Sequence, residues 1–217
     1  MLLISILPGV LWARYFYAKD KYEPEPVLLL IRDFLVGMAI VLPASLLEHP
    51  FRNALAPGVS LPLLFMGSVF VVGLVEEGLK AGAVYFLHHN DPEFNEPVDG
   101  MIYGIMVGLG FAAFENLLYS LVFGYSVGLS RAILTNLLHA SFTGIFGYYY
   151  SRSRIENRSG LPFWGLGLVT TGHGIYNFLI LAGFIGTIEV IVIVVILQII
   201  LASLFKIMNR QSPFKPQ

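Results

Sequence analysis

The sequence predicts an all-α protein that crosses a membrane about seven times. Apolar residues make up 56% of the chain and charged residues only 12%, which is about half the charged share of a soluble domain. The apolar residues also gather in runs long enough to cross a bilayer, for which about 20 residues suffice. At 217 residues the chain suits one domain of ordinary size, so we expect a single integral-membrane domain over residues 1–217.

Hydropathy divides the chain into seven candidate spans with short connections. They cover residues 2–18, 27–47, 61–88, 101–123, 130–150, 161–183 and 186–208. The connections carry turn-forming residues, such as Asn90-Asp91-Pro92 in the third. The first segment has no basic region and no small-residue cleavage site, so we interpret it as a retained span and not as a removed signal peptide.

Lysine and arginine are distributed unevenly between the two ends of these spans. If the N-terminus lies outside, the outer side holds only Arg52 and Arg131, and Lys80 lies within the membrane. The inner ends and loops then hold Arg14, Lys19, Lys21, Arg32, Arg152, Arg154, Arg158, Lys206, Arg210 and Lys215. The positive-inside rule therefore predicts a cell-membrane protein with an external N-terminus and a cytoplasmic C-terminus.

Several chemistries are excluded by residues that the chain lacks. Cysteine is absent, which excludes disulfides, thiolate nucleophiles and sulfur-ligated metals. No H-E-x-x-H sequence is present, and no basic patch interleaved with aromatic residues points to nucleic acid. Ser68 and Ser141 lie outside any nucleophile-elbow setting. The aspartates, which a paired-aspartate protease needs inside its spans, lie at span ends or in loops: Asp20, Asp33, Asp91 and Asp99.

The third span carries Glu76, Glu77 and Lys80 near its centre. Each ionisable group at that depth costs roughly 2.5–3.5 kcal/mol, so we expect a function to retain them. The two glutamates point about 100° apart on a helix. We therefore expect one to activate water in a dry pocket, and the other to hold Lys80 or a neighbouring helix. A purely structural ion pair with Lys80, four residues after Glu76, is the competing interpretation.

The fourth, fifth and sixth spans carry the other polar groups. Glu115 and Asn116 lie in the fourth, His139 in the fifth, and His173 and Asn177, four residues apart on one helical face, in the sixth. The rise of 1.5 Å per residue places these groups and the glutamate pair in one layer of a core about 30 Å thick. We therefore expect the third to sixth spans to form the core, with His173 and Asn177 able to donate to a developing oxyanion.

Four linked motifs resemble those of the PrsW intramembrane protease family. They are Glu76-Glu77-x-x-Lys80, Phe111-x-x-x-Glu115-Asn116, the single His139, and His173-x-x-x-Asn177, in that order. The resemblance covers the whole span architecture. That family is similar to the type II CAAX prenyl endopeptidases, whose proteolysis is described as glutamate-dependent.

The resemblance implies roles for individual residues and a class of substrate. Glu76 matches the water-activating glutamate, and His173 with Asn177 matches the oxyanion-stabilising pair. The prenyl endopeptidases have a histidine where this chain has Glu115 and an arginine near Lys80, which leaves the role of Glu115 open and argues against prenylated substrates. The implied substrate is a single-span anti-sigma factor that receives its first cut from this protein. We expect the reaction to use no cofactor and no metal.

Three alternatives stay open on the sequence alone. His139, His173 and one glutamate are also a known set of catalytic zinc ligands. Aligned glutamate and histidine in spans also mark transporters and proton relays, although no inverted repeat is visible. A non-catalytic scaffold is the third alternative, and retention of the full polar set argues against it.

Overall fold

The computed structural model describes residues 2–216, without the side chains of residues 2–4 and 125–130. The described residues form helices and no strand, which confirms the all-α prediction. The elements are α1 (Leu2–Tyr17), α2 (Val27–Ala39), α3 (Val41–Glu48), the 3-10 helix η1 (His49–Leu55), α4 (Leu61–Met66), the π-helix η2 (Gly67–Gly73), α5 (Leu74–His88), α6 (Asp99–Phe123), α7 (Tyr125–Glu156), α8 (Leu161–Leu181) and α9 (Thr187–Arg210).

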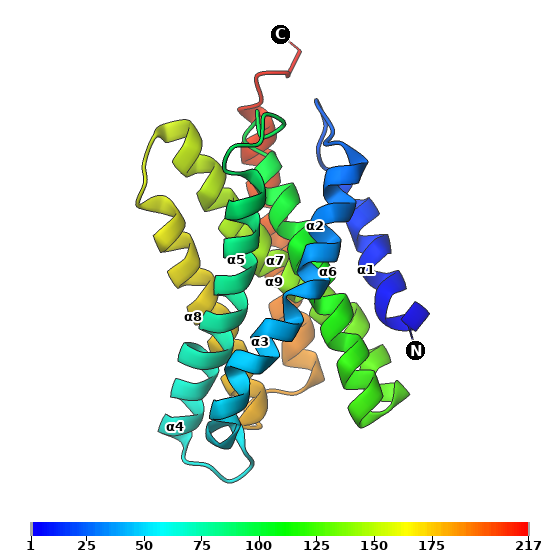
Figure 1. The fold of residues 1–217 in the computed structure, drawn as a ribbon, viewed down its shortest axis with the longest axis vertical. Coiled ribbons are helices and arrows are strands. Elements are labelled where there is room, and N and C mark those ends of the chain that lie inside the picture. Colours follow the sequence, from blue (N-terminus) through cyan, green and yellow to red (C-terminus); the bar gives the residue numbers. More distant parts are fainter. Residues whose placement is uncertain (1, 217) are drawn as a thin grey trace.

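These elements join into long segments that match the predicted spans. α2, α3 and η1 run on from one another, as do α4, η2 and α5 (Figure 1). Among the described residues, four segments are long and apolar enough to cross a membrane: 27–55, 61–88, 99–123 and 187–210. α1 is shorter, with 16 residues, and polar side chains interrupt the apolar runs of α7 and α8. The polytopic membrane fold is therefore supported by the segments with the strongest apolar runs.

α6 is the central helix of the bundle and is buried on nearly all sides over its first half. Its neighbours approach at glycines. A Cβ on Gly110 would lie 1.9 Å from the carbonyl oxygen of Phe34 in α2, and one on Gly108 would lie 2.6 Å from that of His139 in α7. Only glycine permits such close helix contacts. The Gly108 contact holds the α6 side that carries Glu115 against the α7 side that carries His139, and the Gly110 contact holds α6 against α2.

The third predicted span is continuous but is not a regular α-helix throughout. Its middle portion, η2, is a π-helix, a conformation that is rare and frequent at functional sites. η2 packs directly on α8, because a Cβ on Gly73 would lie 2.5 Å from the Thr170 carbonyl oxygen and one on Gly174 would lie 2.4 Å from the Val69 Cα. The contact sets Glu76 and Glu77, just after η2, beside His173. Hydropathy gives no signal for this irregularity.

One end of the bundle gathers segments that carry the basic residues. The Arg154 guanidinium donates to the His88 carbonyl oxygen over 2.7 Å, and the Asn209 amide donates to that of Lys19 over 3.1 Å. The α1–α2 and α5–α6 loops and the C-terminus lie together at this end (Figure 1). η1 and the start of α4 lie at the opposite end.

Candidate active site

Lys80 lies at the centre of the polar layer and is completely buried. Its ammonium donates to Glu76 Oε2 over 3.0 Å and to Glu77 Oε1 over 2.9 Å. It also lies 2.8 Å from His139 Nδ1, which accepts when Lys80 is charged, and 4.0 Å from the Phe111 ring centroid. One cation from α5 therefore connects both glutamates with α7.

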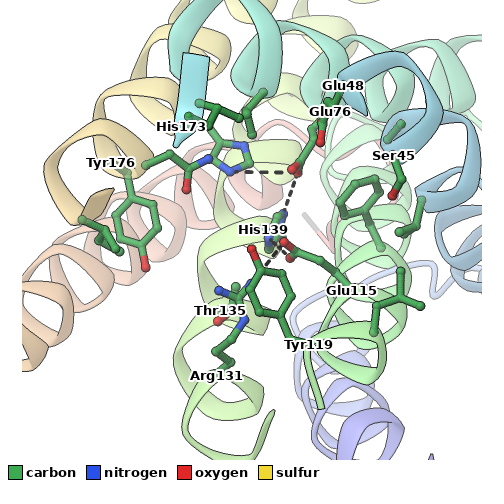
Figure 2. Close-up of a pocket in the computed structure, with 18 of the residues that line it drawn as sticks. Ser45, Glu48, Glu76, Glu115, Tyr119, Arg131, Thr135, His139, His173 and Tyr176 are labelled. Carbon is green, nitrogen blue, oxygen red and sulfur yellow. Dashed lines mark hydrogen bonds and ion pairs between the residues drawn. The ribbon is translucent and has the colours of Figure 1, made fainter. Parts of the chain in front are cut away.

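The two adjacent glutamates have different surroundings. Glu77 is 1% exposed, and its Oε1 lies 2.8 Å from His173 Nδ1. Glu76 instead faces a cavity, and its Oε2 lies 4.0 Å from His173 Nε2 and 3.9 Å from His139 Nδ1. Figure 2 shows Glu76, His139 and His173 pointing toward one another. An ionised Glu77 accepts the Nδ1 proton of His173, so the Nε2 edge of that ring is directed toward Glu76.

Glu115 and His139 form a second part of the layer. His139 Nε2 lies 3.1 Å from Glu115 Oε2, and Glu115 Oε1 accepts an ion pair from Arg131 over 3.1 Å. Asn116, which is fully buried, accepts from Arg131 Nε over 3.3 Å. Both nitrogens of the His139 ring are thus engaged, by Lys80 on one side and by Glu115 on the other.

A cavity of about 390 Å³ lies against this layer. Of the sequence-predicted residues, Glu76, Glu115, His139, His173 and Asn177 line it. Glu77, Lys80 and Asn116 do not line it and hold the lining residues from behind. The structure therefore brings the predicted residues together. It also separates those that line the cavity from those that support them, a distinction that sequence spacing alone does not give.

The cavity also has lining residues that sequence reasoning missed, namely Glu48, Tyr119, Arg131 and Tyr176 (Figure 2). Glu48 closes α3, the end of the second span, and its Oε1 is buried without a hydrogen-bond partner. Arg131 stacks on Tyr119, 3.7 Å from the ring centroid. Both charged residues stand near predicted span ends, where polar residues are expected to meet water. Only the pairing of Arg131 with Glu115, which requires knowledge of the helix contact, marks it as part of the site.

The glycines beside His173 serve packing. A Cβ on Gly172 would lie 2.9 Å from the Phe142 ring, and Gly174 contacts η2. Both glycines therefore permit close contact between helices. Gly78 and Gly82 on α5 differ, since a Cβ on either meets no atom within 4 Å.

The donor atoms for a metal ion are present, but a cation of the chain is already among them. Glu76, Glu77, His139 and His173 each offer a donor atom, all within 4.8 Å of one another, and carboxylate with imidazole is a known zinc set. Three of the four contact the Lys80 ammonium at 2.8–3.0 Å. A metal bound to the same atoms would coincide with that ammonium, so the arrangement does not fit a metal ion while Lys80 stays in place.

Comparisons with known proteins match most of the chain to one family. A family model described as "PrsW family intramembrane metalloprotease" matches residues 25–204. "Protease PrsW" of Geobacillus kaustophilus is 34% identical over 82% of this chain and 78% of its own length. The Bacillus subtilis protein of that name is 33% identical over 82% and 81%, and the Clostridioides difficile one is 32% identical over 97% and 91%.

No solved structure matches the chain. The family model nevertheless covers the segments that bring Glu76, Glu115, His139 and His173 together, and the relatives named as proteases are matched over most of their length. The chain is therefore a multi-pass membrane peptidase and belongs to the PrsW family of intramembrane proteases.

Proposed function

We propose that this peptidase makes the first cut in a membrane-anchored anti-sigma factor, with Glu76 activating the attacking water. The observation that carries the mechanism is the unequal placement of the adjacent glutamates. Glu76 faces the cavity, whereas Glu77 is buried behind it against Lys80 and His173. Of these two glutamates, only Glu76 can meet both a water molecule and a substrate carbonyl.

Glu76 acts as the general base in this mechanism. A water molecule in the cavity gives a proton to the carboxylate while its oxygen attacks the carbonyl carbon. The gap of 4.0 Å between Glu76 Oε2 and His173 Nε2 leaves the two groups unbonded to each other and both directed at the cavity. When the tetrahedral intermediate collapses, the C–N bond breaks and Glu76 returns the proton to the leaving amine.

His173 and Asn177 stabilise the oxyanion. Since Glu77 fixes the Nδ1 side of the ring, an imidazolium form of His173 presents an Nε2–H to the developing negative charge. Asn177 lines the same cavity one helical turn later.

The mechanism uses no metal. Lys80 already supplies the positive charge at the point where the donor atoms converge. It neutralises Glu77 and holds Glu76 in position, while the cavity side of Glu76 stays open to water. The matched family is described as one of metalloproteases. In this chain, however, the position of Lys80 favours glutamate-dependent chemistry over a zinc ion bound to the same atoms.

The cavity favours a cut near the external end of a single-span substrate. Its lining includes Glu48, Leu55, Arg131 and Leu181, which lie near helix ends opposite the basic end of the bundle. The connection there between α6 and α7 is the single residue Gly124, at φ +94°, so no long loop covers that side. In the proposed orientation, with the N-terminus outside, substrate enters from the external side. Its extended backbone must be enclosed by protein, because lipid cannot satisfy its hydrogen bonds.

The test is cleavage of a single-span anti-sigma factor by the pure protein in vesicles. Glu76→Gln keeps the shape of the side chain but cannot take a proton, so cleavage should fall by about 10²–10⁴-fold. Glu189→Gln, at an exposed position on α9, is the matched control and should cleave normally. Mass spectrometry of the products should place the new terminus outside the membrane or just inside the external end of the span. Near-normal cleavage by Glu76→Gln, or a cytoplasmic cut, would contradict the proposal.

A further inference from the structure

Four acidic side chains are buried together at the end of the bundle that carries the basic segments. Asp20 and Glu25 come from the α1–α2 loop, Glu96 from the α5–α6 loop, and Asp99 from the first turn of α6. Their exposed fractions are 4%, 1%, 3% and 0%. Asp20, Glu25 and Asp99 each offer an oxygen within 4.8 Å of the others. The cluster stands apart from the active site, since Asp99 and Glu115 are separated by about 24 Å along α6.

Most of the oxygens in this cluster have no partner. Tyr103 donates its hydroxyl proton to Glu25 Oε2, and two backbone N–H groups donate to Asp99 Oδ2. The oxygens left without a hydrogen bond are both of Asp20, both of Glu96, Glu25 Oε1 and Asp99 Oδ1. Glu96 is the independent observation here, because it lies outside the converging trio and is 3% exposed, and neither of its oxygens is satisfied by a group outside the cluster among the described residues. Its carboxyl lies beside that of Asp20.

No side chain of the described part of the chain neutralises these four acids by an ion pair. Two basic residues of the same end pair with other acids: Arg32 lies 3.2 Å from Asp33, and Arg152 is paired with Glu156. Buried carboxylates without a counter-charge are strongly destabilising. The described part of the chain therefore supplies no positive charge to the ionised form of this cluster.

We propose that Asp20, Glu25, Glu96 and Asp99 bind a hard divalent cation, Mg²⁺ or Ca²⁺. Both ions prefer carboxylate oxygens, and these four residues offer only oxygen. Lys21, Pro24 and Asn95, which neighbour Asp20, Glu25 and Glu96 in the sequence, are exposed, so an ion can arrive from the water at this end of the bundle. When bound, it joins the α1–α2 loop to the start of α6, the helix that carries Glu115.

Shared protons are the competing way to satisfy these groups. Burial raises the pKa of Asp20 to about 8, and the neighbouring Glu96 carboxyl contributes to this shift as the second cause. Burial also raises the pKa of Glu25 to about 7. A bound cation removes the same repulsion without protons, and only the cation account predicts a specific response to added metal.

The experiment measures the melting temperature and metal binding of the full chain in detergent. After treatment with chelator, saturating MgCl₂ or CaCl₂ should raise the melting temperature by about 5 °C. MnCl₂, read by electron paramagnetic resonance as a probe of the same site, should bind with one ion per chain. Asp20→Asn and Glu96→Gln remove no existing hydrogen bond and should each abolish both responses.

Two controls separate this site from the rest of the chain. Glu23→Gln changes a partly exposed acid in the same loop and should keep the response. Glu76→Gln should keep it too, because the ion does not bind the active site. A wild-type protein that gains no stability and binds no Mn²⁺ would overturn the proposal, as would responses that survive in both cluster variants or disappear in Glu76→Gln.

Discussion

The polar layer around Lys80 and the acidic cluster at the basic end of the bundle bury a similar number of carboxylates but compensate them differently. In the layer, Lys80 bonds to both Glu76 and Glu77, and Arg131 pairs with Glu115. In the cluster, most carboxylate oxygens lack even a hydrogen bond. In the layer, the chain therefore supplies its own cations. At the water-facing end, a dissolved ion can do the same.

The largest effect is expected from removing the internal cation. Lys80→Met leaves two glutamates buried beside each other, and such a loss costs about 3–5 kcal/mol, which lowers the melting temperature by roughly 10 °C. Thermal unfolding in detergent measures it, with the exposed Lys206→Met as the control. The double variant Glu77→Gln/Lys80→Met should recover part of the loss. If the Lys80→Met protein were as stable as wild type, the carboxylates of the layer would not depend on an internal cation, and the two regions would not differ in this respect.

The next largest effect is a difference in cleavage rate between variants of the two histidines of the layer. His173 faces Glu76 across the cavity, whereas both nitrogens of His139 are held by Lys80 and Glu115. His173→Ala should therefore lose about 10²–10³-fold in kcat, as loss of an oxyanion donor does, and His139→Ala should lose less. Single-turnover cleavage at saturating substrate measures both. Complete inactivity of a stably folded His139→Ala protein would place its ring in contact with the substrate.

A smaller effect tests how the layer is held in place. Gly174→Ala puts a methyl group 2.4 Å from the Val69 Cα, so α8 must move away from η2 and carry His173 with it. Cleavage should fall and the melting temperature should drop. Gly78→Ala meets open space and should raise stability by about 0.5–1 kcal/mol. Equal behaviour of the two variants would show that helix contact does not position His173.

The smallest expected effect is a change in melting temperature, measured in the presence of chelator. It should have opposite signs for a variant of the acidic cluster and a variant of the polar layer. Asp20→Asn replaces an acid whose charged form has no counter-charge, and its amide can donate to Glu96, so the melting temperature should rise by about 2–4 °C. Glu77→Gln removes a charge that Lys80 requires, so the melting temperature should fall. Parallel melting curves check the two signs. A fall for both variants would mean that the acidic cluster is already balanced without an ion.

The sequence predicts the layer well because membrane depth restricts where polar groups can lie. Glu76, Glu115, His139 and His173 are each anomalous in an apolar run, and a constant rise per residue brings them to one level. The acidic cluster escaped prediction for the opposite reason. Asp20 and Asp99 were correctly expected at span ends, where water usually solvates a carboxylate, and only the folded loops show that they are buried.

Other features depend on contacts that no single segment encodes. The π-helix η2 leaves no trace in hydropathy, yet it lies between Leu61 and Glu76 and packs on α8. Glu48 becomes a cavity residue only because α3 continues α2 past the predicted end of the second span. The choice of Glu76 over Glu77 likewise depends on which side of α5 faces the cavity.

The most direct test of the account is the metal dependence of cleavage. Protein of known metal content, in vesicles with a single-span anti-sigma factor, is assayed with and without a zinc chelator that does not bind Mg²⁺ or Ca²⁺. Because Lys80 occupies the position that a zinc ion would need, we predict the same cleavage rate in both conditions and no stoichiometric zinc. Loss of cleavage in chelator, with recovery on adding one equivalent of zinc, would contradict the account.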